Sequence, residues 1–175
     1  MNQAFDAMQF AREVHRAQTR KYTGNPYADH LAEVCGIAIT AGLYDLNVVP
    51  EDFIAVCWLH DCMEDQGVTF DHLAKRFGYT VASGVHLLSD LEEGNRATRK
   101  AASRARLATA PGWIQTIKCA DLISNTSSIV QHDSKFAVTY LEEKRLLLEV
   151  MTKADPRLRA MAMEQVGRNT LQVAA

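Results

Sequence analysis

The sequence predicts an all-α protein, and three observations support this. Apolar residues recur at three- and four-residue spacing along most of the 175 residues, which is the period of an amphipathic helix. The segments with this period are bounded by helix-capping residues and by glycine or proline. The alternation of apolar and polar residues that marks a half-buried strand is absent. We expect one helical domain over residues 1–175.

The first two helices are expected on either side of a short loop. Apolar residues from Phe5 onward repeat with the helical period, and this helix is expected to end near the Arg20-Lys21 pair. Pro26 suits the first turn of a second helix, whose apolar face continues until Gly42 offers a stop.

A loop at 46–50 precedes the most apolar helix of the chain, over 53–59, which has the composition of a central buried helix. Thr69 and Gly78 then delimit a short helix as its N-cap and its C-terminal exit. The remaining helical segments are expected at 80–88, 96–110, 113–130, 136–151 and from 156 onward.

Composition and charge exclude several classes of protein. Hydrophobic residues make up 47% of the chain, which supplies a core and excludes a disordered chain. The 19 basic and 21 acidic residues give a net charge of −2, whereas a surface built to coat nucleic acid needs an excess of Lys and Arg. No apolar run approaches the roughly 20 residues that cross a bilayer, and no secretory signal precedes the four cysteines. We expect a cytoplasmic protein with buried, reduced thiols and without a membrane or nucleic-acid partner.

Ionisable residues directly follow the buried helix at 53–59. The pairs His60/Glu64 and Asp61/Asp65 are each four residues apart, so each pair shares a helical face. Carboxylates in a buried site are costly unless they are paired or bind a metal. The alternative is that Glu64 and Asp65 form a solvated C-terminal turn, although acidic groups there oppose the helix dipole.

Two further residues extend this group into a set of metal ligands. His30 lies near the start of the second helix, and Asp121 lies within an apolar segment. Each alone has a structural explanation, because His30 can be a core histidine and Asp121 can pair with Lys118. Together with His60 and Asp61, they form a two-His, two-Asp set that suits manganese or iron, with positions left for water.

Three extended motifs containing these residues resemble a known family. They are R-K-Y-T-G-N-P-Y-A-D-H at 20–30, H-D-x-x-E-D at 60–65 and K-x-A-D-x-x-x-N at 118–125. They resemble motifs of the HD superfamily of metal-dependent phosphohydrolases. Within it, they look like those of the RelA/SpoT homologue hydrolases, which remove the 3′-pyrophosphate of the alarmones ppGpp and pppGpp. Stand-alone small alarmone hydrolases, including the metazoan SpoT homologue, are similar from about residue 10 to 129. The resemblance implies an HD-superfamily helical bundle.

The resemblance also implies roles for individual residues. Those that match the family's metal ligands, for which manganese is usual, are His30, His60, Asp61 and Asp121. Glu64 and Asp65 match the catalytic acidic pair, which accepts or passes the proton of a water acidified by the metal. Arg20 and Lys21 match residues near the guanine base and phosphates, and Asn125 matches one near the ribose. A guanidinium can stack on a purine, and an amide can bond a sugar hydroxyl.

The densest basic stretch lies between residues 94 and 106. A solvated helix face is the usual interpretation of such a run, just as Arg20-Lys21 alone would be a basic helix C-terminus. The stretch resembles one in stand-alone bacterial alarmone hydrolases, which implies that part of it neutralises the pyrophosphate being cleaved. The candidates are Arg96, Arg99, Lys100 and Arg104. At least two of these share a helical face.

The implied activity is manganese-dependent hydrolysis of guanosine tetra- and pentaphosphate, a small-molecule nucleotide, to pyrophosphate and GDP or GTP. One alternative is a phosphohydrolase of another nucleotide, such as an adenosine alarmone or NADPH. Another is a nucleotide-binding regulator with weak turnover. Because the chain ends at Ala175, we expect no synthetase domain. Leu122 and Ser124 stand where many long bifunctional relatives carry a basic residue and a histidine. The oligomeric state is left open.

Overall fold

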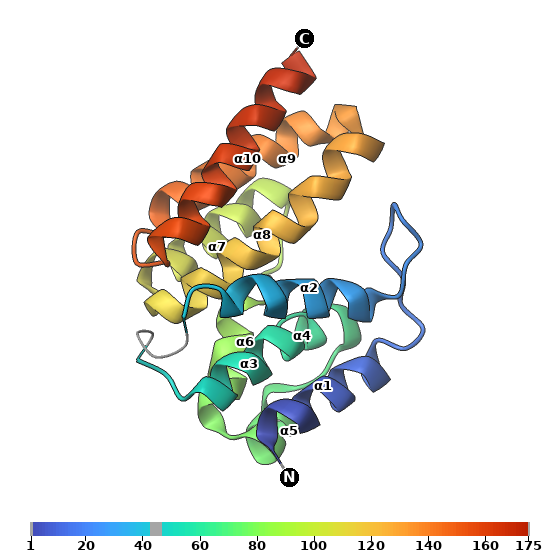
Figure 1. The fold of residues 1–175 in the computed structure, drawn as a ribbon, viewed down its shortest axis with the longest axis vertical. Helices are drawn as coiled ribbons and strands as arrows, with labels where there is room; N and C mark the ends of the chain where they lie inside the picture. The colour runs from blue at the N-terminus through green and yellow to red at the C-terminus, as the bar shows by residue number, and fades with distance from the viewer. Residues whose placement is uncertain (1, 43–46, 175) are drawn as a thin grey trace.

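The computed structural model describes residues 2–42 and 47–174, which form ten α-helices joined by loops (Figure 1). The first six are α1 Gln3–Val14, α2 Tyr27–Ile39, α3 Pro50–Leu59, α4 Cys62–Gln66, α5 Phe70–Phe77 and α6 Tyr79–Leu88. The others are α7 Arg96–Thr109, α8 Gly112–His132, α9 Ser134–Val150 and α10 Pro156–Ala174. These residues contain no strand, and an isolated β-bridge joins Thr19 and Pro26. The all-α prediction is confirmed.

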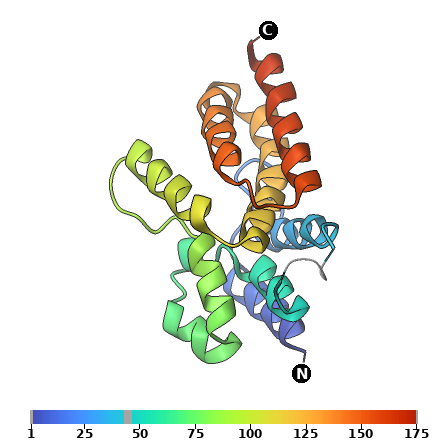
Figure 2. The ribbon, with the colours of Figure 1, turned by 90° about the vertical axis from the view of Figure 1, so that its left-hand side faces the viewer.

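The helices form two groups that meet where α2 packs against α8. On one side, α3 packs against α1, α2 and α6, and α5 packs against α6. On the other side, α10 packs against α8 and α9, and α9 also contacts α7. The two termini lie at opposite ends of the molecule (Figures 1 and 2). The junction of α2, α3 and α8 is therefore the place where segments far apart in sequence come together.

The core is centred on α3, as its composition predicts. Phe53, Val56 and Leu59 are fully buried there. Gly84 of α6 lets this core close, because a Cβ at this position would lie 2.8 Å from both Trp113 Cη2 and Val56 Cγ2. The close contact fixes α6 against α3 and the start of α8.

Side-chain caps set the start of several helices. Thr69 Oγ accepts the N–H of His72 at the start of α5, which confirms the predicted cap. Asn95 Oδ1 accepts the N–H of Thr98 in the same way at α7. The predicted bounds of α5 to α10 agree with the structure to within about two residues. The loop predicted at 46–50 lies partly outside the described residues.

The first helix ends earlier than predicted, at Val14 instead of near Arg20-Lys21. The backbone of the following turn pairs with the segment before α2: Tyr27 N donates to Gln18 O at 3.0 Å, and Arg20 N donates to Asn25 O at 2.9 Å. A continued helix would use these groups internally. The helical period persists in the sequence beyond the point where tertiary pairing ends the helix.

The acidic residues after α3 are also placed differently from one expectation. The chain breaks at His60-Asp61, and Glu64 and Asp65 lie in the first turn of the separate helix α4. Because α4 is only five residues long and ends before Gly67, Glu64 and Asp65 are exposed residues of its single turn.

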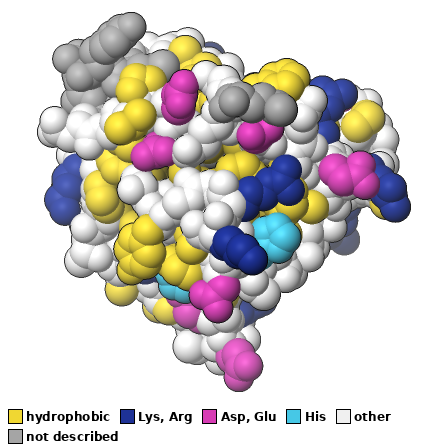
Figure 3. Space-filling model, turned by 90° about the horizontal axis from the view of Figure 1, so that it is seen from below, with side chains coloured by type: hydrophobic (Ala, Val, Ile, Leu, Met, Phe, Trp, Pro, Cys, Tyr) yellow, Lys and Arg dark blue, Asp and Glu magenta, His cyan; other side chains and the backbone are white. Residues whose placement is uncertain are grey.

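The surface and the thiols agree with the composition. On the face seen from below, acidic and basic side chains are interspersed with apolar ones (Figure 3). All four cysteines are buried and free, as predicted. Within the described residues, none of the helices combines the length and the apolar character that crossing a membrane requires.

Candidate active site

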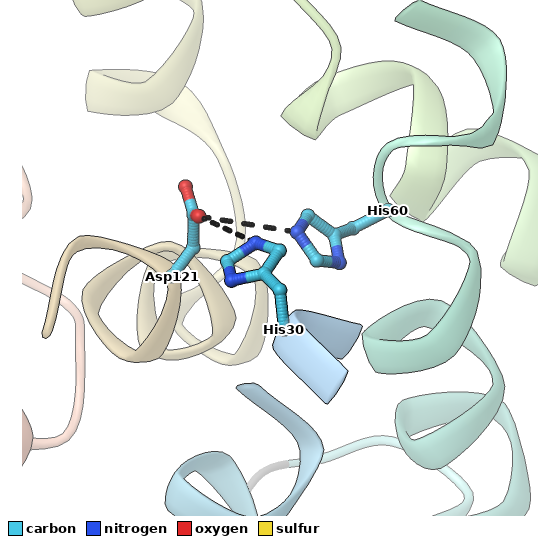
Figure 4. Close-up of side chains that lie close together, drawn as sticks. All are labelled: His30, His60 and Asp121. Atoms are coloured by element: carbon cyan, nitrogen blue, oxygen red, sulfur yellow. Dashed lines mark ion pairs between the residues drawn. The ribbon is translucent and has the colours of Figure 1, made fainter. Parts of the chain in front are cut away.

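The side chains of His30, His60 and Asp121 converge where α2, α3 and α8 meet (Figure 4). One ligand atom of each residue lies within 4.8 Å of the others. His30 Nε2 is 3.4 Å and His60 Nε2 is 3.9 Å from the same oxygen, Asp121 Oδ1. All three residues are at least 95% buried, with exposures of 0%, 1% and 5%. Three of the four predicted ligands thus form one buried cluster.

The fourth predicted ligand, Asp61, lies against the same two imidazoles. Its Oδ2 is 3.0 Å from His60 Nε2 and 3.6 Å from His30 Nε2. The Tyr27 hydroxyl donates to this oxygen at 2.6 Å. The structure therefore brings together all four residues that the sequence motifs single out.

The two imidazoles present unpaired nitrogen atoms to the cluster. His30 Nε2 and His60 Nε2 are buried and lie against carboxylate oxygens of Asp61 and Asp121, and within the described residues neither makes a hydrogen bond of good geometry. His60 Nδ1 is 2.8 Å from the carbonyl oxygen of Cys57, which only accepts, so Nδ1 carries the proton and Nε2 a lone pair. Buried lone pairs without a donor are costly unless a cation binds them. Two such nitrogens with two carboxylates fit a first-row divalent metal ion.

A hydrogen-bond chain through Ser124 orients His30. The Ser124 hydroxyl donates to Glu33 Oε2 at 2.7 Å, because a carboxylate only accepts. Ser124 Oγ is then the acceptor for His30 Nδ1–H at 2.9 Å, so the neutral imidazole has its lone pair on Nε2. Arg20 Nη1 pairs with the same Glu33 oxygen at 2.9 Å. Ser124, at a position where many long relatives have histidine, thus has a defined task here.

The protonation of the cluster shows how strongly it attracts positive charge. Burial lowers the pKa of His30, but the carboxylates of Asp121 and Asp61 have a larger, opposite effect. The net result is a pKa raised to about 9. The pKa of His60 is also raised, by Asp61 and Asp121 against the effect of burial. Burial opposes ionisation of Asp121, yet Lys118 and the histidines hold its pKa well below the usual range. The two carboxylates therefore favour a positive charge at this place, either a proton on a histidine or a metal ion.

A cavity of about 350 Å³ lies beside the cluster, and its walls carry both signs of charge. The acidic lining residues are Asp61, Glu64, Asp65, Asp90 and Asp121. The basic ones are Arg20, Lys21, Lys100, Lys118 and Lys144. Uncharged side chains complete the lining: Tyr22, Thr23, Tyr27, Asn125, Ile129, Phe136 and Tyr140. Such a cavity suits a ligand that carries several negative charges and an apolar ring.

The acidic pair of α4 faces this cavity. Glu64 Oε2 accepts the backbone N–H of Asp90 at 2.9 Å. Asp65 Oδ2 accepts from Gln18 Nε2 at 2.8 Å. Desolvation raises the pKa of Glu64 against the lowering effects of the Asp90 N–H and Lys118. The two neighbouring carboxyl groups therefore have different environments.

Three lysines, from α7, α8 and α9, also line the cavity. Lys100 Nζ pairs with Asp90 Oδ2 at 2.6 Å, and Lys118 Nζ pairs with Asp121 Oδ2 at 2.8 Å. Burial, together with Lys118 and Lys100, lowers the pKa of Lys144 to about 8. Lys118 and Lys100 lie close enough to disfavour the charge of Lys144, which indicates a place for an anion.

The other predicted basic residues are placed less uniformly. Arg96 makes two bonds of 2.7 Å to Glu143 and lies over the Phe136 ring, outside the cavity lining. Arg99 is exposed and belongs to none of the described linings. Arg104 lines a small adjoining pocket together with Lys118 and Lys144. Of the four candidates in α7, Lys100 alone reaches the main cavity among the described residues.

Arg20, Lys21 and Asn125, for which substrate contacts are predicted, line the cavity. Asn125 Nδ2 donates to Asp121 Oδ1 at 2.6 Å, and its Oδ1 accepts from Arg20 Nη2 at 3.3 Å. Lys21 is exposed, with Nζ 4.9 Å from the centre of the Tyr22 ring. The ion pair of Lys118 with Asp121, which was the alternative to a metal site, exists alongside the cluster and uses the other carboxylate oxygen.

Sequence reasoning missed Lys144, Lys118 and Tyr27 as residues of the site. Lys118 and Tyr27 both lie within the quoted motifs, so the motifs held the signal. Lys144 lies four residues after Tyr140, on the buried stripe of α9. A lysine on an apolar stripe is the pattern that could have identified it.

Comparison with known families gives one match over more than half of the chain. The protein-family model described as an HD domain matches residues 7–112. This range includes His30 and the His60-Asp61 pair, whereas Asp121 lies beyond it in α8.

Curated relatives and a solved structure are similar over larger parts. The zebrafish guanosine-3′,5′-bis(diphosphate) 3′-pyrophosphohydrolase MESH1 is 30% identical over 121 residues, which span 69% of this chain and 65% of that protein. An Aquifex aeolicus protein described as the same type of enzyme is 29% identical over 70% of this chain but only 17% of its own length. A solved structure described as a metazoan ortholog of SpoT that hydrolyses ppGpp has a TM-score of 0.83 and covers 98% of this chain and 97% of its own. At 21% sequence identity, that likeness is one of fold.

Proposed function

The chain belongs to the HD domain family, and from this premise we propose that it is a metal-dependent hydrolase of guanosine tetra- and pentaphosphate. The reaction releases the 3′-pyrophosphate and leaves GDP or GTP. One observation carries the proposal: two buried imidazole nitrogens face the carboxylates of Asp61 and Asp121, and these two carboxylates line a cavity that three lysines also line. The activities for which two of the curated relatives are named support it.

The proposed metal ligands are His30, His60, Asp61 and Asp121, and the proposed metal is manganese. Nitrogen and carboxylate donors in this proportion suit that ion. When bound, a divalent ion at this place supplies positive charge that acidifies water and stabilises charge developing on phosphoryl oxygens.

The acidic pair carries out the proton transfers in this proposal. Water attacks the phosphorus attached to the 3′-oxygen, and the bond between them breaks. Asp65 accepts the proton of the attacking water. Glu64, whose pKa is raised by desolvation, supplies a proton to the departing 3′-oxygen. This division follows from the different environments of the two carboxyl groups.

The basic residues bind the nucleotide. The phosphates face Lys100, Lys118 and Lys144, where an anion relieves the repulsion that Lys118 and Lys100 exert on the Lys144 ammonium group. Glu33, Ser124 and Asn125 engage the edges of the Arg20 guanidinium, so its plane is fixed and its face can stack on a purine. Asn125 and Lys21 contact the ribose and the outer phosphates. Contacts of Arg96, Arg99 and Arg104 with substrate stay predictions, of which that of Arg104 has the nearest support.

In this proposal, residues 1–175 form one HD-type hydrolase domain, and the enzyme acts in the cytoplasm. Asp121 of α8 completes the cluster although it lies beyond the residues that match the family model. Four free, buried thiols suit a reducing compartment.

The deciding experiment uses metal-depleted protein, ppGpp and added manganese, with pyrophosphate and GDP measured by ion-exchange chromatography. We expect both products in equal amounts from the wild type and neither from His60→Ala. Absence of turnover by protein whose manganese content has been measured as complete would refute the proposal.

A second candidate is a phosphohydrolase of another purine nucleotide. The contact expected with the base is stacking on Arg20, and every purine offers a face for stacking. Side-by-side rates with ppGpp, an adenosine tetraphosphate analogue and NADPH distinguish the two. A higher kcat/KM for either adenosine substrate would favour this candidate.

A further inference from the structure

Gln18 connects the turn after α1 to the acidic pair of α4. Its Nε2 donates to Asp65 Oδ2 at 2.8 Å, across 47 residues of sequence. Asp65 lies one helical turn from Asp61, since Asp65 N donates to Asp61 O at 2.9 Å. Two carboxylates at this spacing repel each other. The bond from Gln18 therefore holds the Asp65 side chain against a force that would turn it away.

The direction of the Gln18 amide follows from its neighbours. An ionised carboxylate only accepts, so the amide NH₂ faces Asp65 and the amide oxygen faces the opposite way. That oxygen is 2.6 Å from His15 Nδ1 and also accepts from Gln66. His15 consequently has its proton on Nδ1, and its Nε2 is the acceptor for the Cys62 thiol at 3.6 Å. Each group in this series has one role as donor or acceptor.

His15 gives this series a rigid base. The side chain is 2% exposed and stacks on the Tyr27 ring, with centroids 5.0 Å apart and 18° between the planes. The Tyr27 hydroxyl donates in turn to Asp61. Burial raises the pKa of the Cys62 thiol, which keeps it protonated as a donor. The same buried imidazole thus supports Asp65 through Gln18 and Asp61 through Tyr27.

We propose that Gln18 is a positioning residue that aims the Asp65 carboxylate at the attacking water, and that His15 fixes the direction of the Gln18 amide. This inference rests on the role of Asp65 in the proposed function. A positioning residue affects the chemical step and leaves substrate binding and metal binding largely unchanged.

The test compares Gln18→Leu and Gln18→Glu with the wild type. We expect Gln18→Leu to lower kcat for ppGpp roughly 10- to 100-fold, the usual effect of losing a supporting hydrogen bond. KM and the manganese dissociation constant should change by less than about threefold. Gln18→Glu should lower kcat at least as far, because it places a second carboxylate against Asp65. Gln9→Glu, which makes the same charge change at an exposed position of α1, is the matched control and should leave kcat unchanged.

His15 variants separate positioning from simple support of the fold. His15→Asn retains an N–H near the position of Nδ1, whereas His15→Leu does not. We expect kcat of His15→Asn to lie closer to the wild-type value, at equal folded fractions by circular dichroism. Equal kcat in the two variants would remove His15 from the inference.

Two results would overturn the role of Gln18. One is kcat of Gln18→Leu within about twofold of the wild type, and the other is a raised KM at constant kcat, which marks a substrate contact. Crystal structures of wild type and Gln18→Leu give a readout independent of turnover. We expect Asp65 to change rotamer or become disordered in the variant. If the wild type hydrolyses no nucleotide, the proposed function fails, and an unchanged Asp65 rotamer still refutes the positioning by Gln18.

Discussion

Lys118 and Asp121 form an ion pair in which Nζ lies 2.8 Å from Oδ2, while Oδ1 of the same carboxylate faces both buried histidines. One carboxylate thus connects the two histidines to Lys118, one of the three lysines that line the cavity. A change on one side of Asp121 must alter the other.

Lys118→Gln is expected to change metal binding and substrate binding in opposite directions. Loss of the Lys118 cation makes the electrostatic potential at Asp121 more negative, so manganese should bind more tightly. The same loss removes a positive charge from the cavity, so KM for ppGpp should rise. Each effect should be about tenfold, since a charge at about 4 Å is worth roughly 1 to 4 kcal/mol in a wet or partly buried site. Calorimetric manganese titration and initial rates measure the two. Lys75→Gln, at an exposed position of α5, is the control. A parallel change in both quantities would contradict this account of the ion pair.

Ser124→Ala should weaken manganese binding roughly 10- to 100-fold, because His30 loses the acceptor that fixes its tautomer. Ser124→Thr retains the hydroxyl and should stay near the wild-type affinity. The dissociation constant is measured by titration of metal-depleted protein. Equal affinities in the two variants would show that Ser124 does not orient His30.

Manganese binding should release protons and depend on pH. With a pKa of about 9, His30 is protonated at neutral pH when no metal is bound, and the metal takes the neutral imidazole. The apparent affinity should therefore rise with pH and level off above about pH 9. Titrations at pH 7.5 in buffers of different ionisation enthalpy should give about one proton or more per manganese. A value of zero would be incompatible with the protonated state of His30.

Lys144 should make stability depend on pH in the alkaline range. Its pKa is about 8 in the folded protein, against 10.5 for an unperturbed lysine, so the native state loses the proton first. The free energy of unfolding therefore rises with pH. The contribution of Lys144 is complete above about pH 10.5 and is lost as pH falls through about 8. Relative to Lys144→Met, the free energy of unfolding of the wild type should rise by on the order of 3 kcal/mol between these two pH values. Urea unfolding of both proteins at several pH values measures this gain, and parallel curves would argue against a desolvated Lys144.

Gly84→Ala should destabilise the protein by about 1 to 3 kcal/mol, because the new Cβ would lie 2.8 Å from Trp113 and Val56. Gly36→Ala in α2 has nothing within 4 Å of the new Cβ and should stabilise the protein by up to about 1 kcal/mol. Thermal unfolding of both variants checks these opposite signs. A stable Gly84→Ala would mean that α6 can move away from the core.

The sequence was enough to predict that four ligands converge, because the three motifs and their order identify His30, His60, Asp61 and Asp121. The fold class could be predicted from the helical spacing of apolar residues. The early end of α1 could not, since the pairing that replaces the helix joins Gln18 and Arg20 to a segment with no local signal.

The orientation of the α7 cations also lay beyond the sequence. Arg96 and Lys100 are one turn apart, yet Arg96 pairs with Glu143 while Lys100 enters the cavity. The choice depends on how α7 packs against α9, which spacing along one helix does not reveal.

Because the cluster joins α2 and α3 of one helix group to α8 of the other, a bound ion acts as a cross-link that closes a long chain loop. Its binding free energy adds to folding by mass action. The loaded protein should therefore melt as a single cooperative unit, whereas stripping the ion should loosen the contact between the two helix groups before either group loses its own packing.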